Sequence, residues 1–252
     1  MIELRDICLS FAERTLISNA SARFACGTMT ALLGRNGTGK STLLRAIAAL
    51  GKVQGGEIVV DGHEISTLSS VELARRVAFV NTERIDVEAL TAYDLVAVGR
   101  SPYTDWMGRL RADDERIIER SMQIAGVENM ARRMVATLSD GECQRVMIAR
   151  ALAQDTPIIL LDEPTAFLDL PNRYELCTLL SRLAHDEGKC IIFSTHELDI
   201  ALSLADSIAL VDTPALRHLP TAEMIASGNI ERLFDSEYVS FDAATQSIKL
   251  CK

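Results

Sequence analysis

A glycine-rich run with one lysine and one serine is the first stretch of the chain that could do chemistry. Residues 34–41 read Gly-Arg-Asn-Gly-Thr-Gly-Lys-Ser, which matches the pattern G-x-x-x-x-G-K-[ST]. Glycines let backbone N–H groups surround phosphate oxygens, while the lysine supplies a positive charge and the serine hydroxyl can bind Mg²⁺. The alternative is a glycine-rich turn with an incidental lysine. The predicted phosphate ligands are Gly34, Asn36, Gly37, Thr38, Gly39, Lys40, Ser41 and Thr42.

Two carboxylates follow an apolar segment further along the chain. Residues 158–161 are Ile-Ile-Leu-Leu, and Asp162 and Glu163 come directly after them. A carboxylate at a strand end that faces a phosphate loop can hold Mg²⁺ directly or through water, which is the role expected of Asp162. Glu163 points in a different direction and can orient or deprotonate an attacking water. The alternative is solvated charge at the end of a strand.

Two more polar stations follow apolar segments. His196 comes after residues 190–195 and could hydrogen-bond a phosphate or water, although a lone histidine after a strand can also be structural. Asn-Thr-Glu at 81–83 follows Val-Ala-Phe-Val at 77–80. Ligands of an open parallel sheet bind at the carboxyl ends of its strands. Polar groups at four such ends therefore predict one shared binding edge.

The elements that must position these groups alternate between strands and helices. The phosphate loop should lead into a helix with Leu43, Leu44, Ile47 and Leu50 on one stripe. Another helix should open at Asp113 and stop at Gly126, within a helix-rich middle part. This pattern predicts an α/β fold with a helical insertion. The expected strands cover residues 2–9, 20–25, 29–33, 57–60, 77–80, 158–161, 190–194, 208–211 and 246–250.

Length and charge exclude several classes of protein. The chain has 252 residues, a length that suits one domain. Its net charge of −9 argues against binding of nucleic acid over a broad surface. No apolar run approaches the roughly 18 residues of a membrane span, and the charged start lacks a signal-peptide core. We expect a cytosolic chain unless a partner holds it at a membrane. Its six cysteines are expected to be small buried residues in a reducing compartment.

One stretch connects these features to a family. Leu-Ser-Asp-Gly-Glu at 138–142 resembles the signature motif of ATP-binding cassette (ABC) ATPases, whose common form is Leu-Ser-Gly-Gly-Gln. The order also agrees: phosphate loop, helical insertion, signature, Asp162–Glu163 and His196. Residues 165–169 resemble the D-loop of that family, with Asp169 as its aspartate. Over about residues 2–215 the chain is therefore identified as a member of the ABC ATPases.

The resemblance implies a fold and a set of roles. The fold is α/β, a P-loop NTPase core with a mainly parallel sheet, an N-terminal antiparallel β subdomain and an inserted α-helical subdomain. A single domain over 1–252 would comprise a nucleotide-binding core at 1–82 and 151–252 and a helical subdomain at 83–150. ATP and Mg²⁺ are the implied cofactors, with Ser41 and Asp162 as metal ligands and Lys40, Glu163 and His196 as catalytic residues. Phe11 matches an adenine-stacking aromatic, although by its own pattern it could be a core residue.

The signature implies a second copy of the chain. Ser139 and the Gly141 N–H stand at a helix start, which is an anion-binding geometry. In the family this motif completes the ATP site of the partner, so the resemblance implies a homodimer that forms on ATP binding. The residues implied to act in trans are Ser139, Asp140, Gly141 and Glu142.

Two departures from the family pattern bear on the chemistry. Asp140 replaces a glycine and Glu142 a glutamine, and we expect both to point outward or to cap the helix rather than face the γ-phosphate. Thr82 stands where the family has a glutamine that contacts Mg²⁺ and water. The hypothesis is that Glu83 takes over that role through a shift of the loop.

A final stretch indicates the kind of transporter. Residues 95–106 resemble ATPase subunits of importers for iron–siderophore, haem or cobalamin. Such a subunit works with two integral membrane permease subunits and indirectly with a periplasmic or surface substrate-binding protein. It lies peripherally on the cytoplasmic side of the inner membrane and binds no nucleic acid. An export or lipid-transport ATPase and a non-transport ABC ATPase are the alternatives. Tyr93, Tyr103 and Trp106 could form a partner groove or the core of the insertion.

Overall fold

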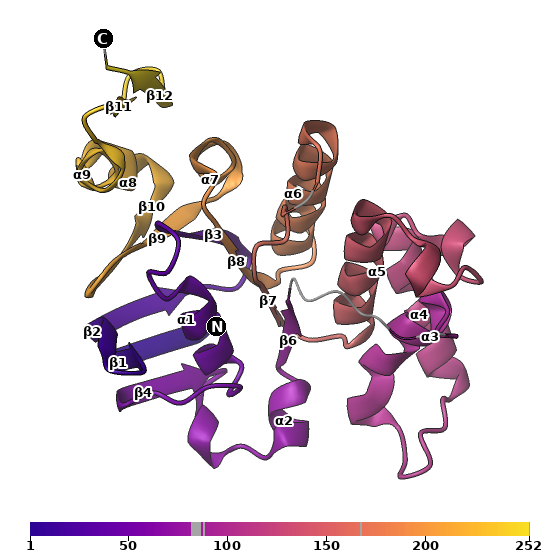
Figure 1. Ribbon diagram of the computed structural model, residues 1–252. Coiled ribbons are helices and arrows are strands. Elements are labelled where there is room, and N and C mark those ends of the chain that lie inside the picture. Colours follow the sequence, from indigo (N-terminus) through magenta and orange to yellow (C-terminus); the bar gives the residue numbers. More distant parts are fainter. Residues whose placement is uncertain (82–86, 88, 167, 252) are drawn as a thin grey trace.

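A six-stranded sheet forms the centre of the computed structural model, which describes residues 1–81, 87, 89–166 and 168–251 (Figure 1). The strand order is β10-β9-β3-β8-β7-β6, and every neighbouring pair is parallel except β9 with β10. The strands are β3 (Thr28–Leu33), β6 (Val77–Val80), β7 (Ile158–Leu161), β8 (Cys190–Thr195), β9 (Ser207–Asp212) and β10 (Ala215–Pro220).

Two antiparallel sheets complete the β structure of the described residues. The larger has the order β2-β1-β4-β5 and holds the N-terminal strands. The smaller is a hairpin of β11 and β12 near the C-terminus, beyond α8 and α9 (Figure 1). The strands are β1 (Ile2–Phe11), β2 (Arg14–Phe24), β4 (Gly55–Val60), β5 (His63–Glu64), β11 (Val239–Asp242) and β12 (Ser247–Leu250).

Helices cover the large sheet and build a separate group beside β6. This group consists of α3, α4 and α5, with the 3₁₀ helix η2 (Val98–Tyr103) (Figure 1). The helices are α1 (Lys40–Ile47), α2 (Ser70–Ala74), α3 (Ala92–Ala97), α4 (Ala112–Ala125), α5 (Asp140–Ala153), α6 (Leu170–His185), α7 (Leu198–Leu204), α8 (Thr221–Ala226) and α9 (Asn229–Phe234).

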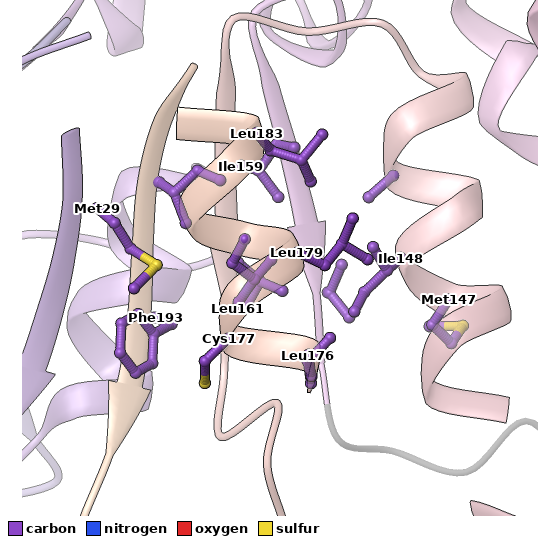
Figure 2. Packing of buried hydrophobic residues seen from close by; sticks show 14 of the residues in the cluster. Met29, Met147, Ile148, Ile159, Leu161, Leu176, Cys177, Leu179, Leu183 and Phe193 are labelled. Carbon is purple, nitrogen blue, oxygen red and sulfur yellow. The ribbon is translucent and has the colours of Figure 1, made fainter. Parts of the chain in front are cut away.

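The large sheet is apolar on both faces because helices or strands cover each of them. Alternate residues of β7 belong to different clusters: Ile159 and Leu161 join the helical side, whereas Ile158 and Leu160 pack toward the antiparallel sheet and α1. Figure 2 shows the helical side, where leucines of α6 lie between the sheet and α5. The leucines of α6 that Figure 2 labels are Leu176, Leu179 and Leu183.

The predicted fold class is confirmed, with differences at particular elements. β2 begins at Arg14, six residues before the predicted start, because its polar residues lie on the exposed face of an antiparallel sheet. The first helix ends at Ile47, so Leu50 lies outside the stripe and is exposed. Gly126 ends α4 in a left-handed conformation, as predicted. The subdomain boundaries after residues 82 and 150 stay predictions.

The expectation for the cysteines was wrong for four of the six. All six are free, and only Cys177 and Cys190 are buried. Burial raises the pKa of both thiols to about 12, so they stay protonated. Cys26 and Cys251 are exposed and the other two are partly buried. Within the described part of the chain, no helix combines the length and apolarity that a membrane crossing requires.

Candidate functional site

The predicted chemical groups meet at one edge of the large sheet. The glycine-rich loop follows β3, Asp162 and Glu163 follow β7, and His196 follows β8. These three strands are neighbours in the order β3-β8-β7 and run parallel, so their carboxyl ends lie together. The fourth predicted station follows β6. Its Asn81 is described, whereas Thr82 and Glu83 lie outside the described residues.

The glycine-rich loop wraps around the Lys40 ammonium group. Lys40 Nζ donates to the carbonyl oxygens of Gly34 at 2.9 Å and Arg35 at 3.3 Å. Gly39 has φ of 103°, a left-handed conformation that suits glycine, and precedes α1. Burial lowers the pKa of Lys40, and the nearby carboxylates of Glu163 and Asp162 oppose that shift. The loop thus holds a desolvated cation at the start of a helix, which favours an anion.

Gly34 and Thr38 support this loop from behind. A Cβ on Gly34 would lie 2.7 Å from the Val211 carbonyl oxygen, so only glycine allows this approach. The Thr38 hydroxyl donates to the Arg35 carbonyl, and the Thr38 carbonyl accepts from Thr213. Neither residue lines the cavity beside the loop. Both were predicted to bind the nucleotide; here the Thr38 side chain bonds within the loop, and the Gly34 backbone packs against β9.

Asp162 sits at the centre of a hydroxyl network. The Ser41 hydroxyl donates to Asp162 Oδ1 at 2.9 Å, and the Ser194 hydroxyl donates to the same oxygen at 2.7 Å. The Glu163 N–H donates to the Ser194 oxygen at 2.8 Å. Ser194 therefore orients both acidic residues, and the sequence reasoning missed it. The available signal was a serine near the end of an otherwise apolar, fully buried strand.

Glu163 has an unusual backbone conformation, and its carboxylate lies near the side chains of Lys40 and His196. Its φ is 43°, a left-handed conformation that is uncommon for a residue with a side chain. Its Oε1 lies 4.0 Å from Lys40 Nζ and 3.6 Å from His196 Nδ1. The His196 side chain is half exposed. The structure thus brings Lys40, Glu163 and His196 together, as the sequence predicted.

A cavity of about 510 Å³ opens over this network. Phe11, the last residue of β1, borders it and is 71% exposed, so the core interpretation of Phe11 was wrong. Arg14 and Leu16 of β2 also line it, and the sequence reasoning missed both. The remaining lining residues are Asn36, Gly37, Gly39, Lys40, Ser41, Thr42, Asp162 and Glu163. The cavity combines an aromatic edge with a phosphate loop.

The oxygens beside the loop suit Mg²⁺. Ser41 Oγ and Asp162 Oδ1 are close enough to bind one ion together, and a hydroxyl plus a carboxylate is the oxygen donor set that Mg²⁺ prefers. Among the described residues, no cluster of three or more histidine, cysteine or acidic side chains could hold a metal. A site with few protein ligands is typical of Mg²⁺ that also binds substrate phosphates.

The signature residues form a capped helix start away from this cavity. Ser139 is the N-cap of α5, with its hydroxyl oxygen accepting from the Glu142 N–H at 3.3 Å. Glu142 Oε2 accepts from the Ser139 N–H at 2.8 Å, which confirms the expected capping role of Glu142. Asp140 is exposed. No signature residue is among the described residues that line the cavity of its own chain.

Asp169 also caps a helix, while the aromatic residues of the insertion divide into different environments. The Asp169 carboxylate accepts from the Asn172 N–H at 3.1 Å at the start of α6. Tyr93 packs against the main hydrophobic cluster. Tyr103 lies against the Arg100 guanidinium, 4.0 Å from ring centroid to Cζ. Trp106 is 92% exposed, so the core interpretation holds for Tyr93 but not for Trp106.

Comparisons with known proteins identify the family of this chain. A profile described as ABC transporter matches residues 17–166. The achromobactin transport ATP-binding protein of Dickeya dadantii is 36% identical, over 93% of this chain and 87% of its own length. The ferric enterobactin transport ATP-binding protein of Escherichia coli is 35% identical, over 91% and 85%.

A solved structure agrees with these sequence matches. A dimeric ATP-binding cassette in a post-hydrolysis state, bound to ADP and Pi, aligns with a TM-score of 0.75. Its sequence is 27% identical, and the match covers 88% of this chain and 99% of that one. With a phosphate loop beside a cavity and a capped signature helix in the expected order, the chain belongs to the ABC transporter family and is one of its ATPases.

Proposed function

We propose that this chain powers the import of an iron–siderophore, haem or cobalamin-type substrate through separate membrane subunits. The single observation that carries the chemistry is the meeting of Lys40, Ser41, Asp162 and Glu163 at one sheet edge beside a 510 Å³ cavity. The import direction is supported by two relatives, a petrobactin import ATP-binding protein of Bacillus anthracis and an iron(3+)-hydroxamate import ATP-binding protein of Bacillus subtilis, which are 35% and 32% identical to this chain. The chain would bind peripherally at the cytoplasmic side of the inner membrane.

Each residue of the site has a distinct role in the proposed hydrolysis of ATP. Phe11 stacks on the adenine, and Lys40 with the loop N–H groups binds the β- and γ-phosphates. Ser41 and Asp162 would hold Mg²⁺, which would neutralise charge on the phosphates. Glu163 orients the attacking water and accepts its proton, and His196 hydrogen-bonds the γ-phosphate or that water. Ser194 positions both Asp162 and Glu163 through its hydroxyl.

The active assembly is a homodimer in which the signature of one copy completes the ATP site of the other. Ser139 and the Gly141 N–H stand at the N-terminus of α5, where backbone N–H groups favour an anion. They do not line the cavity of their own chain, which favours a phosphate bound by a second copy over one in the same chain. The dimeric cassette with bound ADP and Pi supports this arrangement. Loss of the bridging γ-phosphate would then open the dimer.

Glu163→Gln tests the catalytic assignment and the dimer together. We expect hydrolysis to fall by about 100-fold or more, because a general base is removed, while ATP affinity stays nearly unchanged. With ATP and Mg²⁺ the variant should accumulate at twice the chain mass of 27.6 kDa, measured by light scattering. Glu115→Gln on the exposed side of α4 is the matched control. Equal losses of hydrolysis and binding, or a persistent monomer even with the membrane subunits present, would reject the proposal.

A groove beside the site is the proposed contact with the permease subunits. It has a volume of about 840 Å³ and lies between the end of α1, helix α2, strand β6 and the C-terminal part of α5. Its lining is mainly apolar, and the exposed Leu50 belongs to it, which explains why Leu50 is not a core residue. A short amphipathic helix of a membrane subunit would bind there by its apolar face. The apolar lining includes Ala48, Ala49, Leu50, Ile65, Leu68, Leu73, Ala74, Val77 and Phe79.

The segment that leads to Trp106 is hydrogen-bonded to neighbouring helices at Arg100 and Pro102. Arg100 is buried and donates to Asp114 Oδ1 at 2.8 Å and to the Ala153 carbonyl at 2.9 Å. Arg75, which caps α2, donates to the Pro102 carbonyl at 2.8 Å. These bonds join the backbone before Trp106 to α2, α4 and α5, and tryptophan is one of the residues most often found at binding hot spots.

Reconstitution tests the substrate class against the alternatives. The chain and its permease subunits would be placed in vesicles with the substrate-binding protein, loaded in turn with ferric siderophore, haem or cobalamin. We expect one of these three to stimulate ATP hydrolysis and to enter the vesicle. Stimulation only by lipid, with transport outward, would favour the export class. Stimulation of the isolated chain by DNA or RNA would favour a non-transport ATPase.

A further inference from the structure

The Glu142 carboxylate of the signature is hydrogen-bonded to the Ser139 hydroxyl, the group that is proposed to bind a phosphate. Glu142 Oε2 accepts from the Ser139 hydroxyl at 3.0 Å, in addition to the Ser139 N–H. The same hydroxyl oxygen accepts from the Glu142 N–H. Ser139 and Glu142 therefore form one unit, and the carboxylate lies directly beside the donors that the proposed function assigns to the γ-phosphate of a second copy.

This carboxylate is charged at neutral pH. Hydrogen bonds from the Ser139 N–H and the Arg133 guanidinium lower the pKa of Glu142 below its ordinary value of 4.5 and outweigh the opposing effect of burial. A negative charge next to a γ-phosphate repels it unless a cation compensates. A glutamine at this position has no charge and would not repel the phosphate. The chain therefore needs a compensating group within reach of Glu142.

Arg133 is that group. Its Nη1 lies 2.6 Å from Glu142 Oε1, and its Nη2 donates to the Thr137 carbonyl at 3.0 Å. The first contact compensates the charge of the carboxylate at Oε1, the oxygen that does not contact Ser139. The second fixes the loop that leads into the signature. The Arg133 side chain is 43% exposed, so its position depends on these two contacts rather than on a closed core.

The backbone of Arg133 is held in place at the start of the helical group. The Arg133 carbonyl accepts from the Ala92 N–H at 2.9 Å, and the Arg133 N–H donates to the Met130 carbonyl at 2.8 Å. Ala92 is buried at the first turn of α3. The Arg133 backbone is thus joined to α3, so Arg133 and Glu142 belong to the same helical group.

We propose that Arg133 is a positioning residue for the signature, which pairs with Glu142 so that Ser139 can donate to the γ-phosphate of ATP bound by a second copy. The inference rests on the proposed function, because it assumes that the signature acts in trans. It goes further in assigning to a residue outside every recognised motif the task of making an acidic signature compatible with a phosphate.

A double-mutant cycle tests this pairing. Four proteins are compared in the Glu163→Gln background, which is expected to accumulate as the ATP dimer: the parent, Arg133→Met, Glu142→Gln and the double variant. The readout is the dimer dissociation constant with ATP and Mg²⁺, measured by analytical ultracentrifugation. We expect Arg133→Met to weaken dimerisation by about tenfold when Glu142 is present and by less than about twofold when the Glu142→Gln change is present as well. Arg133→Lys, which keeps the charge, should restore most of the loss.

A second measurement separates positioning from simple loss of folding. ATP affinity at protein concentrations that keep the chain monomeric reports only the Lys40 loop, so it should be the same in all variants. An equal effect of Arg133→Met in both backgrounds, or no effect in either, would overturn the pairing while leaving the trans site intact. Failure of the Glu163→Gln parent to dimerise would overturn the proposed function itself, and with it this inference.

Discussion

The Ser41 hydroxyl donates a hydrogen bond of 2.9 Å to Oδ1 of Asp162, although 121 residues separate the two in the chain. The contact joins the first turn of α1 to the end of β7. It exists because β3 and β7 both flank β8 in a parallel sheet, which sends their carboxyl ends to one edge. The two oxygens that the family resemblance assigns to Mg²⁺ are thus preassembled by the topology.

Asp162→Asn should raise the Mg²⁺ concentration needed for half-maximal ATP hydrolysis by about tenfold or more, because it removes one of few charged ligands. A titration of hydrolysis against Mg²⁺ at fixed ATP measures this shift. Asp113→Asn changes an exposed carboxylate on α4 and should leave the titration as in the parent. An unchanged Mg²⁺ requirement in Asp162→Asn would remove Asp162 from the metal site.

Gly34→Ala should weaken both the fold and ATP binding. The added methyl group would lie 2.7 Å from the Val211 carbonyl oxygen and 2.9 Å from Thr38 Oγ1, so the loop has to shift. Overpacking of this kind costs about 1–3 kcal/mol of unfolding free energy, measurable by urea denaturation. Gly51→Ala is the control, since its nearest neighbour would be at an ordinary 3.6 Å. Equal stability of the two variants would contradict the close packing at Gly34.

Arg100→Leu should destabilise the protein at neutral pH. Arg100 and Asp114 form a buried ion pair at 2.8 Å, and removal of one partner leaves the other charge buried alone. The expected loss is roughly 3 kcal/mol of unfolding free energy. Asp113→Asn, which breaks an exposed pair with Arg116 on the same helix, should change it by less than about 0.5 kcal/mol. Thermal and urea unfolding of the two variants would separate these values.

The loss in Arg100→Leu should also depend on pH. Burial opposes ionisation of Asp114, but the Arg111 N–H and the Arg100 guanidinium outweigh it, so the pKa of Asp114 lies below 3.8. The stability that comes from a lowered carboxylate pKa is present above that ordinary value and disappears as the pH falls through the folded value. The difference between parent and variant should therefore be full at pH 7 and shrink below pH 3.8. A constant difference would refute this linkage.

Trp106→Ala should reduce binding to the permease subunits and leave ATP hydrolysis by the isolated chain as it was. Truncation of a central aromatic anchor costs about 2 kcal/mol of binding free energy or more, or roughly a 30-fold change in affinity. Co-purification with the membrane subunits measures it. Tyr238→Ala removes another exposed aromatic from the segment before β11 and is the control. Intact assembly of Trp106→Ala would place the tryptophan outside the interface.

Sequence patterns were sufficient where one physical rule decides the structure. Buried strands such as Ile158–Leu161 are continuous apolar runs, and Gly126 stops α4 because glycine tolerates positive φ. Patterns were insufficient where the outcome depends on distant partners. The length of β2 depends on pairing with β1, and the exposure of Leu50 depends on the groove that it lines.

The site was predicted in its motif residues and missed in its supporting ones. Lys40, Asp162 and Glu163 belong to motifs with a recognisable spacing. Each motif follows a predicted parallel strand, so the sequence also predicted that the three residues meet at one edge of the sheet. Ser194 and Arg133 belong to no recognisable motif. Their roles come from contacts with Asp162 and Glu142, which lie 32 and 9 residues away and are reached only in the folded chain. Thr82 and Glu83 lie outside the described residues, so the hypothesis of a replaced glutamine stays a prediction.

The two ends of helix α5 contact different parts of the protein. Its 14 residues span about 21 Å, with Ser139 capping the start and Arg150 donating to the Phe79 carbonyl near the end. The Gly99 backbone is so close to that end that a Cβ would lie 2.3 Å from the Arg150 carbonyl oxygen. Helix α5 therefore links Ser139, which is proposed to bind a phosphate of a second copy, to the backbone that leads to Trp106, so one continuous helix joins the two proposed binding regions.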